Sequence, residues 1–269
     1  MPRQLISHGR LLLDYATAKR AAWTAVRNLV AIAKMDQEEE RDEHRWDEDP
    51  QHGRHPCVPG ASVKTRNGGR TWSTPRRLSR GILGPIKNKP VVLADGALLC
   101  PSSTEHLGWR APLERSEDLG ANWRRFAPLN TREFSAIQPC ILMYPDGRLQ
   151  VLCRTRQGVI AACWSSDGGL SWGPMHATSL PNPDSGIDAV SLRDGRGVLA
   201  YNPSQEARTP LCLAVISDGH IWRDALVLED AGGEYSYPAI IQASDGTLHV
   251  TYTWNRRRIR HVRVSLDEL

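Results

Sequence analysis

From Pro56 onward the chain is a series of short apolar runs separated by polar turn sequences. In the clearest stretch, an apolar run from Ile137 to Tyr144 is followed by the pair Asp146-Gly147, by a second run from Leu149 to Cys153 and by a third from Val159 to Trp164. An Asp-Gly pair between apolar runs is a strong hairpin signal, because the turn needs a positive φ that glycine adopts without strain. The pattern therefore predicts antiparallel β-structure in which hairpins follow one another along the chain.

Two markers recur with a period near fifty residues. The first is the motif S-x-D-x-G-x-x-W, complete at Ser165–Trp172 and Ser116–Trp123, varied at Thr65–Trp72 and partial at Val215–Trp222. The second is the Asp-Gly pair, at Asp95-Gly96, Asp146-Gly147, Asp194-Gly195 and Asp245-Gly246. The closing tryptophans of the first motif are 51, 49 and 50 residues apart, and repeats of this length are typical of propeller blades. The motif predicts the fold and says little about chemistry, since its Ser and Asp side chains serve the turn backbone.

The N-terminal part has a different pattern. Residues 10–35 place apolar side chains at helical spacing, which predicts an amphipathic α-helix. Residues 36–49 hold nine acids and two arginines, so their charge of −7 leaves about +11 on the rest of a chain whose net charge is +4. That excess fits an anionic ligand or, more commonly, a basic surface. We therefore expect an N-terminal helix and acidic segment over residues 1–50, and a β-propeller over 51–269 that is incomplete on its N-terminal side.

The repeat also predicts where a ligand would bind. Strands that alternate in direction place the Asp-Gly turns and the longer motifs on one face, and the other ends of the inner hairpins on the opposite face. The residues eight places before each Asp are Lys87, Gln138, Gly186 and Tyr237, and those eight places after it are Ser103, Arg154, Asn202 and Thr253. They are expected to ring the mouth of the central channel, where propellers bind ligands. Several are polar at the ends of apolar strands, which a scaffold alone does not require.

The repeated motifs resemble the Asp-boxes of the sialidase (neuraminidase) superfamily of six-bladed propellers. About two-thirds of the chain resembles BNR-repeat sialidase-like proteins, most clearly at Gly84–Pro90, Pro101–Glu105, Ala136–Pro139, Gly233–Pro238 and His249–Trp254. The resemblance implies an all-β, sialidase-like β-propeller with about four regular blades of a normally six-bladed fold. The predicted N-terminal α-helix would precede it.

Sialidases hold the sugar carboxylate with three arginines and attack with a tyrosine assisted by a glutamate, while an aspartate acts as acid. The resemblance implies that Arg154 and Arg208 belong to the arginine set, because forked guanidinium donors suit a planar carboxylate. It implies that Tyr237 is the nucleophile, with Tyr235 as the fallback, since a neutral tyrosine avoids repulsion from the substrate's own charge. The alternative for each arginine is a surface salt bridge, and the alternative for Tyr237 is a core position.

The sequence also departs from the family pattern. Gln138 stands where the glutamate is expected, and a neutral amide cannot take a proton from tyrosine. Glu234 is the expected replacement base, and Glu105 is a second carboxylate for that role. The remaining residues expected to contact the ligand are Lys87, Asn88, Asp188 and Asn202. No early arginine and no acid aspartate has a match.

Other signals narrow the function. The six cysteines lack metal-ligand spacing, and no phosphate loop or dinucleotide fingerprint is present, so no cofactor or metal is expected. The basic run 256–263 contains alternating apolar residues and favours a solvated last strand over a nucleic-acid site. No apolar run reaches membrane-spanning length. The location is expected to be cytoplasmic or is left unknown, because no signal peptide is visible but the N-terminus looks truncated or replaced. The oligomeric state stays open.

The resemblance implies a sialidase-like glycoside hydrolase of the exo-alpha-sialidase type, acting on terminal acidic sugars of glycoconjugates or oligosaccharides. The alternative is a non-catalytic carbohydrate-binding propeller or an inactive truncated sialidase homologue.

Overall fold

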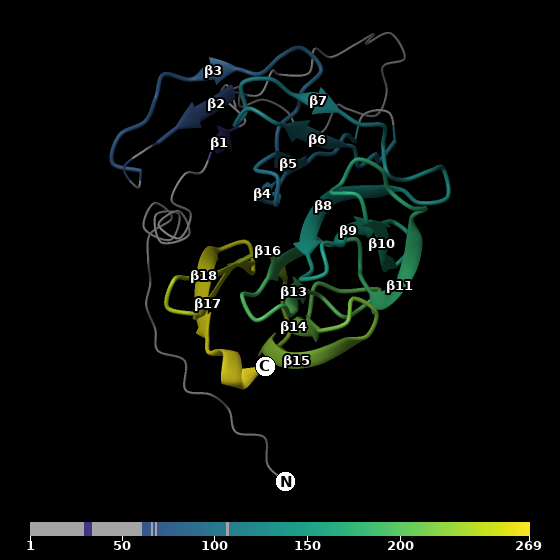
Figure 1. Cartoon of the computed structure of the whole chain (residues 1–269). Coiled ribbons are helices and arrows are strands. Elements are labelled where there is room, and N and C mark those ends of the chain that lie inside the picture. Colours follow the sequence, from purple (N-terminus) through teal and green to yellow (C-terminus); the bar gives the residue numbers. More distant parts are fainter. Residues whose placement is uncertain (1–29, 34–60, 66, 68, 106–107) are drawn as a thin grey trace, which may run out of the picture.

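The computed structural model describes residues 30–33, 61–65, 67, 69–105 and 108–269. In these residues the strands form five antiparallel sheets that follow one another around a common centre (Figure 1), and one 3-10 turn, Leu266–Glu268, ends the chain. Three sheets have four strands: β4 (Val91–Val92), β5 (Leu98–Pro101), β6 (Leu113–Ser116) and β7 (Arg124–Arg125); β8 (Ala136–Met143), β9 (Leu149–Thr155), β10 (Val159–Ser165) and β11 (His176–Pro181); and β12 (Asp188–Ser191), β13 (Gly197–Tyr201), β14 (Leu211–Ile216) and β15 (Trp222–Glu229). Two have three strands: β16 (Tyr235–Gln242), β17 (Leu248–Trp254) and β18 (Arg258–Val264); and β1 (Val30–Ala33), β2 (Ala61–Lys64) and β3 (Arg76–Arg77).

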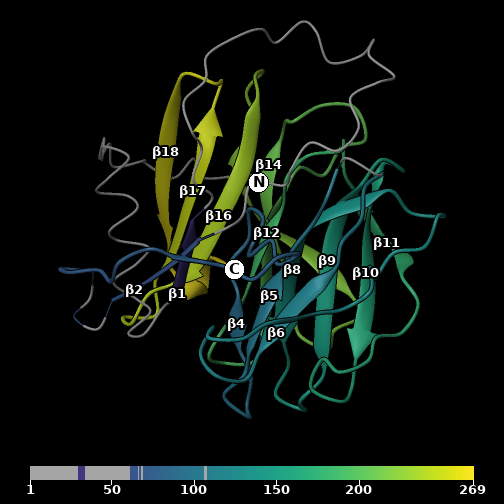
Figure 2. The same ribbon diagram turned by 90° about the horizontal axis from the view of Figure 1, so that it is seen from above.

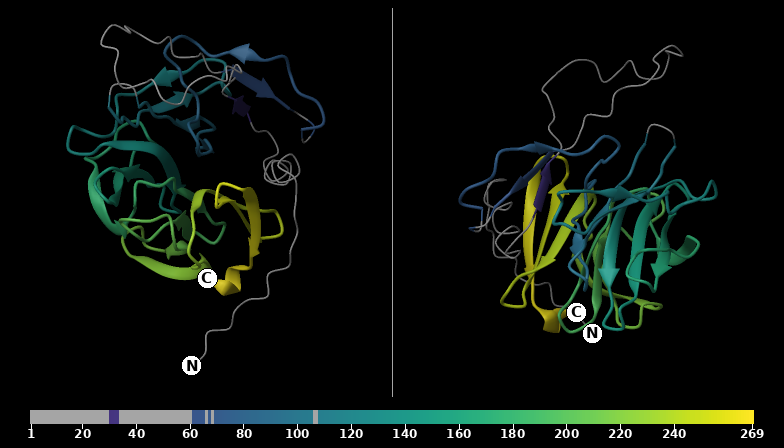
Figure 3. Two further views of the ribbon diagram at one scale, coloured as in Figure 1. Left: turned by 180° about the vertical axis from the view of Figure 1, so that it is seen from behind. Right: turned by 45° about the horizontal axis from the view of Figure 1, so that its top comes forward.

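The four sheets from β4 to β18 are propeller blades. In each, the strand order follows the chain, as in a meander. β12 contacts both β8 and β16, the first strands of the blades on either side of it, and β5 contacts β8. Viewed from above (Figure 2) these inner strands stand together, and from behind (Figure 3) the sheets follow an arc around them. The predicted all-β propeller with four regular blades is confirmed.

The predicted N-terminal helix is wrong where it can be compared with the structure. Residues Val30–Ala33 form strand β1, which pairs antiparallel with β2, Val30 opposite Lys64 and Ala33 opposite Ala61. Pairing with a distant strand overrides a local helical periodicity, because periodicity is only a weak guide to structure. The rest of the predicted helix and the acidic segment lie outside the described residues.

The repeated motif closes the outer turn of a blade, as Ser165–Trp172 shows. The Ser165 hydroxyl accepts the Gly169 amide at 2.9 Å, and Asp167 Oδ1 accepts the amides of Leu170 and Ser171 at 3.0 Å. Hydrogen bonds from the side chain and then the backbone of Ser171 lower the pKa of Asp167 to about 2. Trp172 donates its indole N–H to the Gly169 carbonyl at 3.3 Å. The motif therefore carries the turn's own hydrogen bonds, which is why it predicts the fold.

The core consists of apolar layers between successive blades. One layer joins the blades of β4–β7 and β8–β11, a second joins β8–β11 and β12–β15, and a third joins β12–β15 and β16–β18. The five cysteines in the described residues are buried free thiols, and desolvation raises the pKa of Cys140 to about 12. In the described part of the chain, no helix has the length and apolar character that a membrane crossing needs.

Candidate functional site

The inner hairpins are irregular at the end opposite their Asp-Gly turns, where the mouth was predicted. The pairing of β8 with β9 and of β16 with β17 shifts register there. Gln138 and Tyr237, which lie in these two bulges, have left-handed φ angles of 53° and 51°, and Lys87 at the equivalent position has 71°. Bulges re-aim side chains, and strained non-glycine residues concentrate at functional sites. The repeated irregularity therefore marks this end of the blades as the candidate site.

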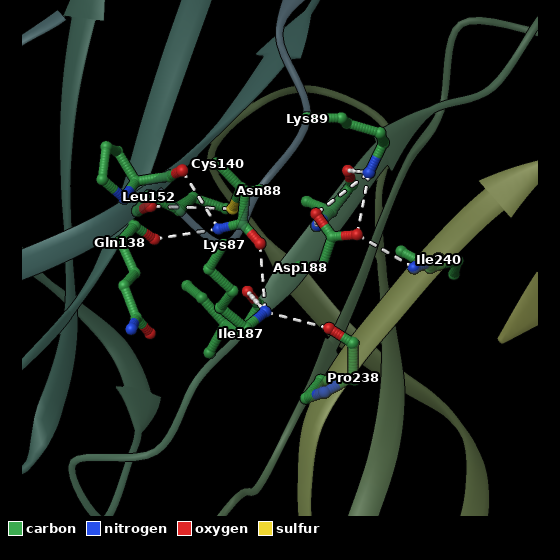
Figure 4. A network of polar contacts seen from close by, with 12 residues as sticks. Lys87, Asn88, Lys89, Gln138, Cys140, Leu152, Ile187, Asp188, Pro238 and Ile240 are labelled. Carbon is green, nitrogen blue, oxygen red and sulfur yellow. Dashed lines mark hydrogen bonds and ion pairs between the residues drawn. The ribbon is translucent and has the colours of Figure 1, made fainter. Parts of the chain in front are cut away.

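Lys87 reaches across this end of the channel (Figure 4). Its Nζ donates to the carbonyl of Ile187 at 2.6 Å, to the carbonyl of Pro238 at 2.9 Å and to Oδ1 of Asn88 at 3.0 Å. Although the residue as a whole is exposed, desolvation of the ammonium group lowers the pKa of Lys87 to about 8. All three donors of the ammonium are used, so Lys87 joins three blades.

Asn88 and Asp188 are also bonded within the protein (Figure 4). Asn88 Nδ2 donates to two backbone carbonyls of the β8 bulge, at 2.9 and 3.0 Å. Asp188 is 4% exposed and accepts from Lys89 Nζ at 2.9 and 2.8 Å and from the Ile240 amide at 2.9 Å. The structure places both residues in bonds that join blades, and a ligand contact by either one stays a prediction.

Arg154, the penultimate residue of β9, lies beside an aromatic ring. Its guanidinium carbon lies 4.9 Å from the ring centroid of buried Trp109, and that of Arg156 lies 4.4 Å from the same ring. Arg154 Nε faces Asp184 Oδ1 at 3.7 Å, and its Nη1 donates to the Asp184 carbonyl at 3.4 Å. Cation–π contacts with a buried indole hold both arginines in place.

Asp184 is a site residue that the sequence reasoning missed. Its φ is 54°, and the loop around it is pinned: the Ser185 amide donates to Asn182 Oδ1 at 2.9 Å, and the Ser185 hydroxyl donates to Asn202 Oδ1 at 2.7 Å. Asn202, predicted as a ligand contact, is fully buried and supports this loop. The available signal was the turn sequence 183–186, directly before an inner strand on the mouth face.

The electrostatics around Asp184 are unusual for an aspartate. Desolvation raises its pKa above the ordinary value, and the negative charge of exposed Glu105 acts in the same direction. The positive charges that act in the opposite direction belong to Arg154, Arg156 and Arg208. The mouth therefore gathers three arginines around one carboxyl group that holds its proton more tightly than usual.

Tyr237 lies on the same side of the channel. It is 45% exposed, and the guanidinium carbon of Arg208 is 5.6 Å from its ring centroid. Arg208 Nη1 also donates to Glu234 Oε1 at 3.2 Å, and Arg256 Nε donates to Glu234 Oε2 at 2.8 Å. Desolvation opposes ionisation of Glu234, but the hydrogen bond from Arg256 and the other polar contacts hold its pKa below the ordinary value. The fallback Tyr235 is only 1% exposed and belongs to the core.

Unpartnered polar atoms also gather at the mouth. The described residues contain five buried side-chain nitrogen or oxygen atoms without a hydrogen-bond partner. Four belong to mouth residues: Ser103 Oγ, Gln138 Oε1, Arg154 Nε and Asp184 Oδ1. Arg154 Nε and Asp184 Oδ1 face each other at 3.7 Å as an ion pair, whereas Ser103 Oγ and Gln138 Oε1 have no polar partner among the described residues. Buried polar atoms are nearly always bonded, so these two atoms indicate positions that a ligand or water satisfies. The described residues hold no group of three or more His, Cys, Asp or Glu side chains that could bind a metal ion.

Comparisons with known proteins agree with this architecture. The family model of the BNR repeat-like domain matches residues 44–250. The NanB sialidase of Streptococcus pneumoniae is similar with a TM-score of 0.65 and 15% identity, over 78% of this chain and 36% of that one. The intramolecular trans-sialidase of Ruminococcus gnavus gives 0.64 and 19%, over 78% and 51%. A protein of unknown function from Dyadobacter fermentans gives 0.65 and 19%, over 76% and 63%.

These likenesses have defined limits. The chain spans less than two-thirds of the length of these solved relatives. At such identities the likeness shows the fold, which is the sialidase propeller. No curated protein matches the sequence. Because the family model covers most of the chain, the protein belongs to the BNR repeat-like family and is a sialidase-like BNR-repeat protein.

Proposed function

We propose that the protein is a sialidase-type glycoside hydrolase that acts on a terminal acidic sugar. The observation that carries this proposal is an exposed tyrosine in a strained bulge, with the guanidinium of Arg208 over its ring. A phenol beside a guanidinium suits attack on a sugar that carries its own carboxylate. NanB and the trans-sialidase, which share the fold, are named for reactions of sialic acid.

Two arginines can hold the substrate carboxylate. Arg208 uses only Nη1 in its hydrogen bond to Glu234, and Arg154 uses only Nη1, in its hydrogen bond to the Asp184 carbonyl. Each guanidinium therefore keeps N–H donors for a second carboxylate, which is the geometry that forked donors favour. Arg156 adds positive charge beside Arg154 on the same indole.

The chemistry requires a nucleophile and a proton carrier. The Tyr237 oxygen would bond to the anomeric carbon, and its proton would leave to solvent, which reaches this side chain. Asp184, whose pKa is raised, would give a proton to the leaving oxygen as the glycosidic bond breaks. Water would then bond to the anomeric carbon and break its bond to Tyr237, while Asp184 takes a proton from that water and solvent returns one to the Tyr237 oxygen. Glu234, the base expected from the sequence, is bonded to two arginines and is a weaker proton acceptor.

One observation favours the second candidate, a carbohydrate-binding propeller without turnover. Gln138 occupies the position where a carboxylate would assist the tyrosine, and its buried Oε1 makes no hydrogen bond. In the described part of the chain no carboxylate is hydrogen-bonded to the Tyr237 hydroxyl. Such a site would bind an acidic sugar without activating its nucleophile.

The test uses an aryl glycoside of N-acetylneuraminic acid with the full chain, and titration calorimetry with the free sugar. Turnover lost at least about a thousandfold in Tyr237→Phe, but kept in the matched core variant Tyr235→Phe, supports the hydrolase. Binding without turnover, converted to turnover by Gln138→Glu, would assign the binding module instead. A chain that neither binds nor turns over acidic sugars contradicts both.

A further inference from the structure

The positive charge of this chain is concentrated in one stretch. Residues 51–94 contain nine lysines and arginines and no aspartate or glutamate, where the chain's average content of acids would place about five. Lys87 and Lys89 are bonded inside the channel. The other described members are exposed: Lys64, Arg70, Arg76, Arg77 and Arg80.

The exposed arginines of β3 lie close to those of β7, a strand of the next sheet. Strands β3 and β7 lie along the same edge of the molecule (Figure 1). Arg76 of β3 donates to the Ala121 carbonyl at 3.2 Å, and Arg125 of β7 donates in the other direction to the Gly81 carbonyl at 3.1 Å. We define the basic seam as the five exposed arginines Arg76, Arg77, Arg80, Arg124 and Arg125.

The charges of the basic seam are only partly offset by the described residues around it: buried Glu114 lies opposite Arg125 in the pairing of β6 with β7 and interacts electrostatically with it. The seam arginines that cross the boundary donate to backbone carbonyls, and in the described part of the chain none of the five is paired with a carboxylate. The exposed acids that precede β7 have other partners. Glu117 pairs with Arg115, and Asp118 accepts two hydrogen bonds from Asn122 at 2.7 Å. The seam therefore presents five exposed guanidinium groups to solvent, a basic patch that attracts anions.

We propose that the basic seam binds an extended acidic polysaccharide that carries carboxylate or sulfate groups. Guanidinium groups along two neighbouring strands match a linear polyanion, and their forked donors fit either anion. The described residues offer no helix that could enter a nucleic-acid groove. The choice of a polysaccharide rests on the proposed function, in which the same chain takes an acidic sugar at its mouth. The seam would hold the glycan away from the reacting end.

The experiment compares two double variants of the full chain by fluorescence anisotropy with labelled chondroitin sulfate. Arg77→Ser/Arg80→Ser removes two seam charges, while Arg223→Ser/Arg263→Ser removes two exposed charges elsewhere. Because the seam variant loses two of the five seam cations, we expect it to bind at least about tenfold more weakly and the control to stay within about twofold of the wild type. Added salt should weaken wild-type binding further.

The experiment distinguishes a failure of the seam proposal from a failure of the proposed function. Equal losses in both variants, no binding by the wild type, or tighter binding of duplex DNA of matched charge would each overturn the proposal. A chain that binds the polysaccharide through the seam but does not bind N-acetylneuraminic acid would keep the seam and reject the proposed function of the mouth.

Discussion

Replacing Asp188 by alanine tests the network that joins the blades beneath the mouth. The wild-type carboxylate, 4% exposed, accepts from Lys89 Nζ and from the Ile240 amide of the next blade. The variant leaves that amide without an acceptor and the ammonium without its carboxylate partner, although the Ala189 carbonyl still accepts from Lys89 at 2.9 Å. Because Asp188 was predicted from the sequence as a ligand contact, the result separates a structural role from a binding role.

The magnitude follows from the exposure of each partner. A buried amide without its acceptor costs about 1–3 kcal/mol. The Lys89 side chain is 33% exposed, so solvent weakens its ion pair with Asp188. Losing that pair should cost about 1 kcal/mol, well below the cost of breaking a fully buried pair. We expect Asp188→Ala to lower the free energy of unfolding by about 3 kcal/mol. At 2–4 °C for each kcal/mol, the Tm should fall by roughly 6–12 °C.

Urea unfolding followed by tryptophan fluorescence measures this change. Asp194→Ala is the matched control, because its carboxylate is paired with Arg196 at the surface and should cost less than about 1 kcal/mol. A double-mutant cycle with Lys89→Met isolates the ion pair. A stability within about 0.5 kcal/mol of the wild type, together with lost affinity for the sugar, would refute the structural role and restore the predicted ligand contact.

Three further predictions follow from the same structure. Gly186→Ala places a Cβ 2.8 Å from Lys87 Cε and 3.1 Å from Tyr237 Cδ1. Titration calorimetry should therefore show weaker sugar binding, and thermal melting should show a free energy of unfolding lower by about 1–2 kcal/mol. Because the pKa of Lys87 is lowered in the folded protein, this side chain binds its proton more tightly in the unfolded chain. The free energy of unfolding of the wild type should therefore rise relative to that of Lys87→Met between about pH 8 and 10.5. Desolvation lowers the pKa of both His249 and His261, and His249 Nδ1 lies 2.9 Å from His261 Nε2. The free energy of unfolding should therefore decrease as the pH drops below about 6.5, and it should decrease less in His261→Gln.

The propeller was predictable because its signals are local. Asp-Gly pairs and the motif at Ser165–Trp172 carry the hydrogen bonds of their own turns, so each works without knowledge of the rest of the chain. A constant period then places equivalent residues at the same end of every blade. That reasoning located Gln138 and Tyr237, which the structure places in equivalent bulges.

Tertiary structure decided what depends on residues far apart in sequence. β1 pairs with β2 across residues 34–60, against a helical periodicity that considers only near neighbours. Lys89 and Asp188 are 99 residues apart, and nothing in either segment shows that one would use the other's charge. The same holds for Asp184, which became a site residue because its loop places it against arginines of other segments. The hydrogen bonds of a turn join residues that are close in sequence, so they can be predicted from the sequence. Desolvation and ion pairing depend on residues that are close only in space, so they arise only once the blades have packed.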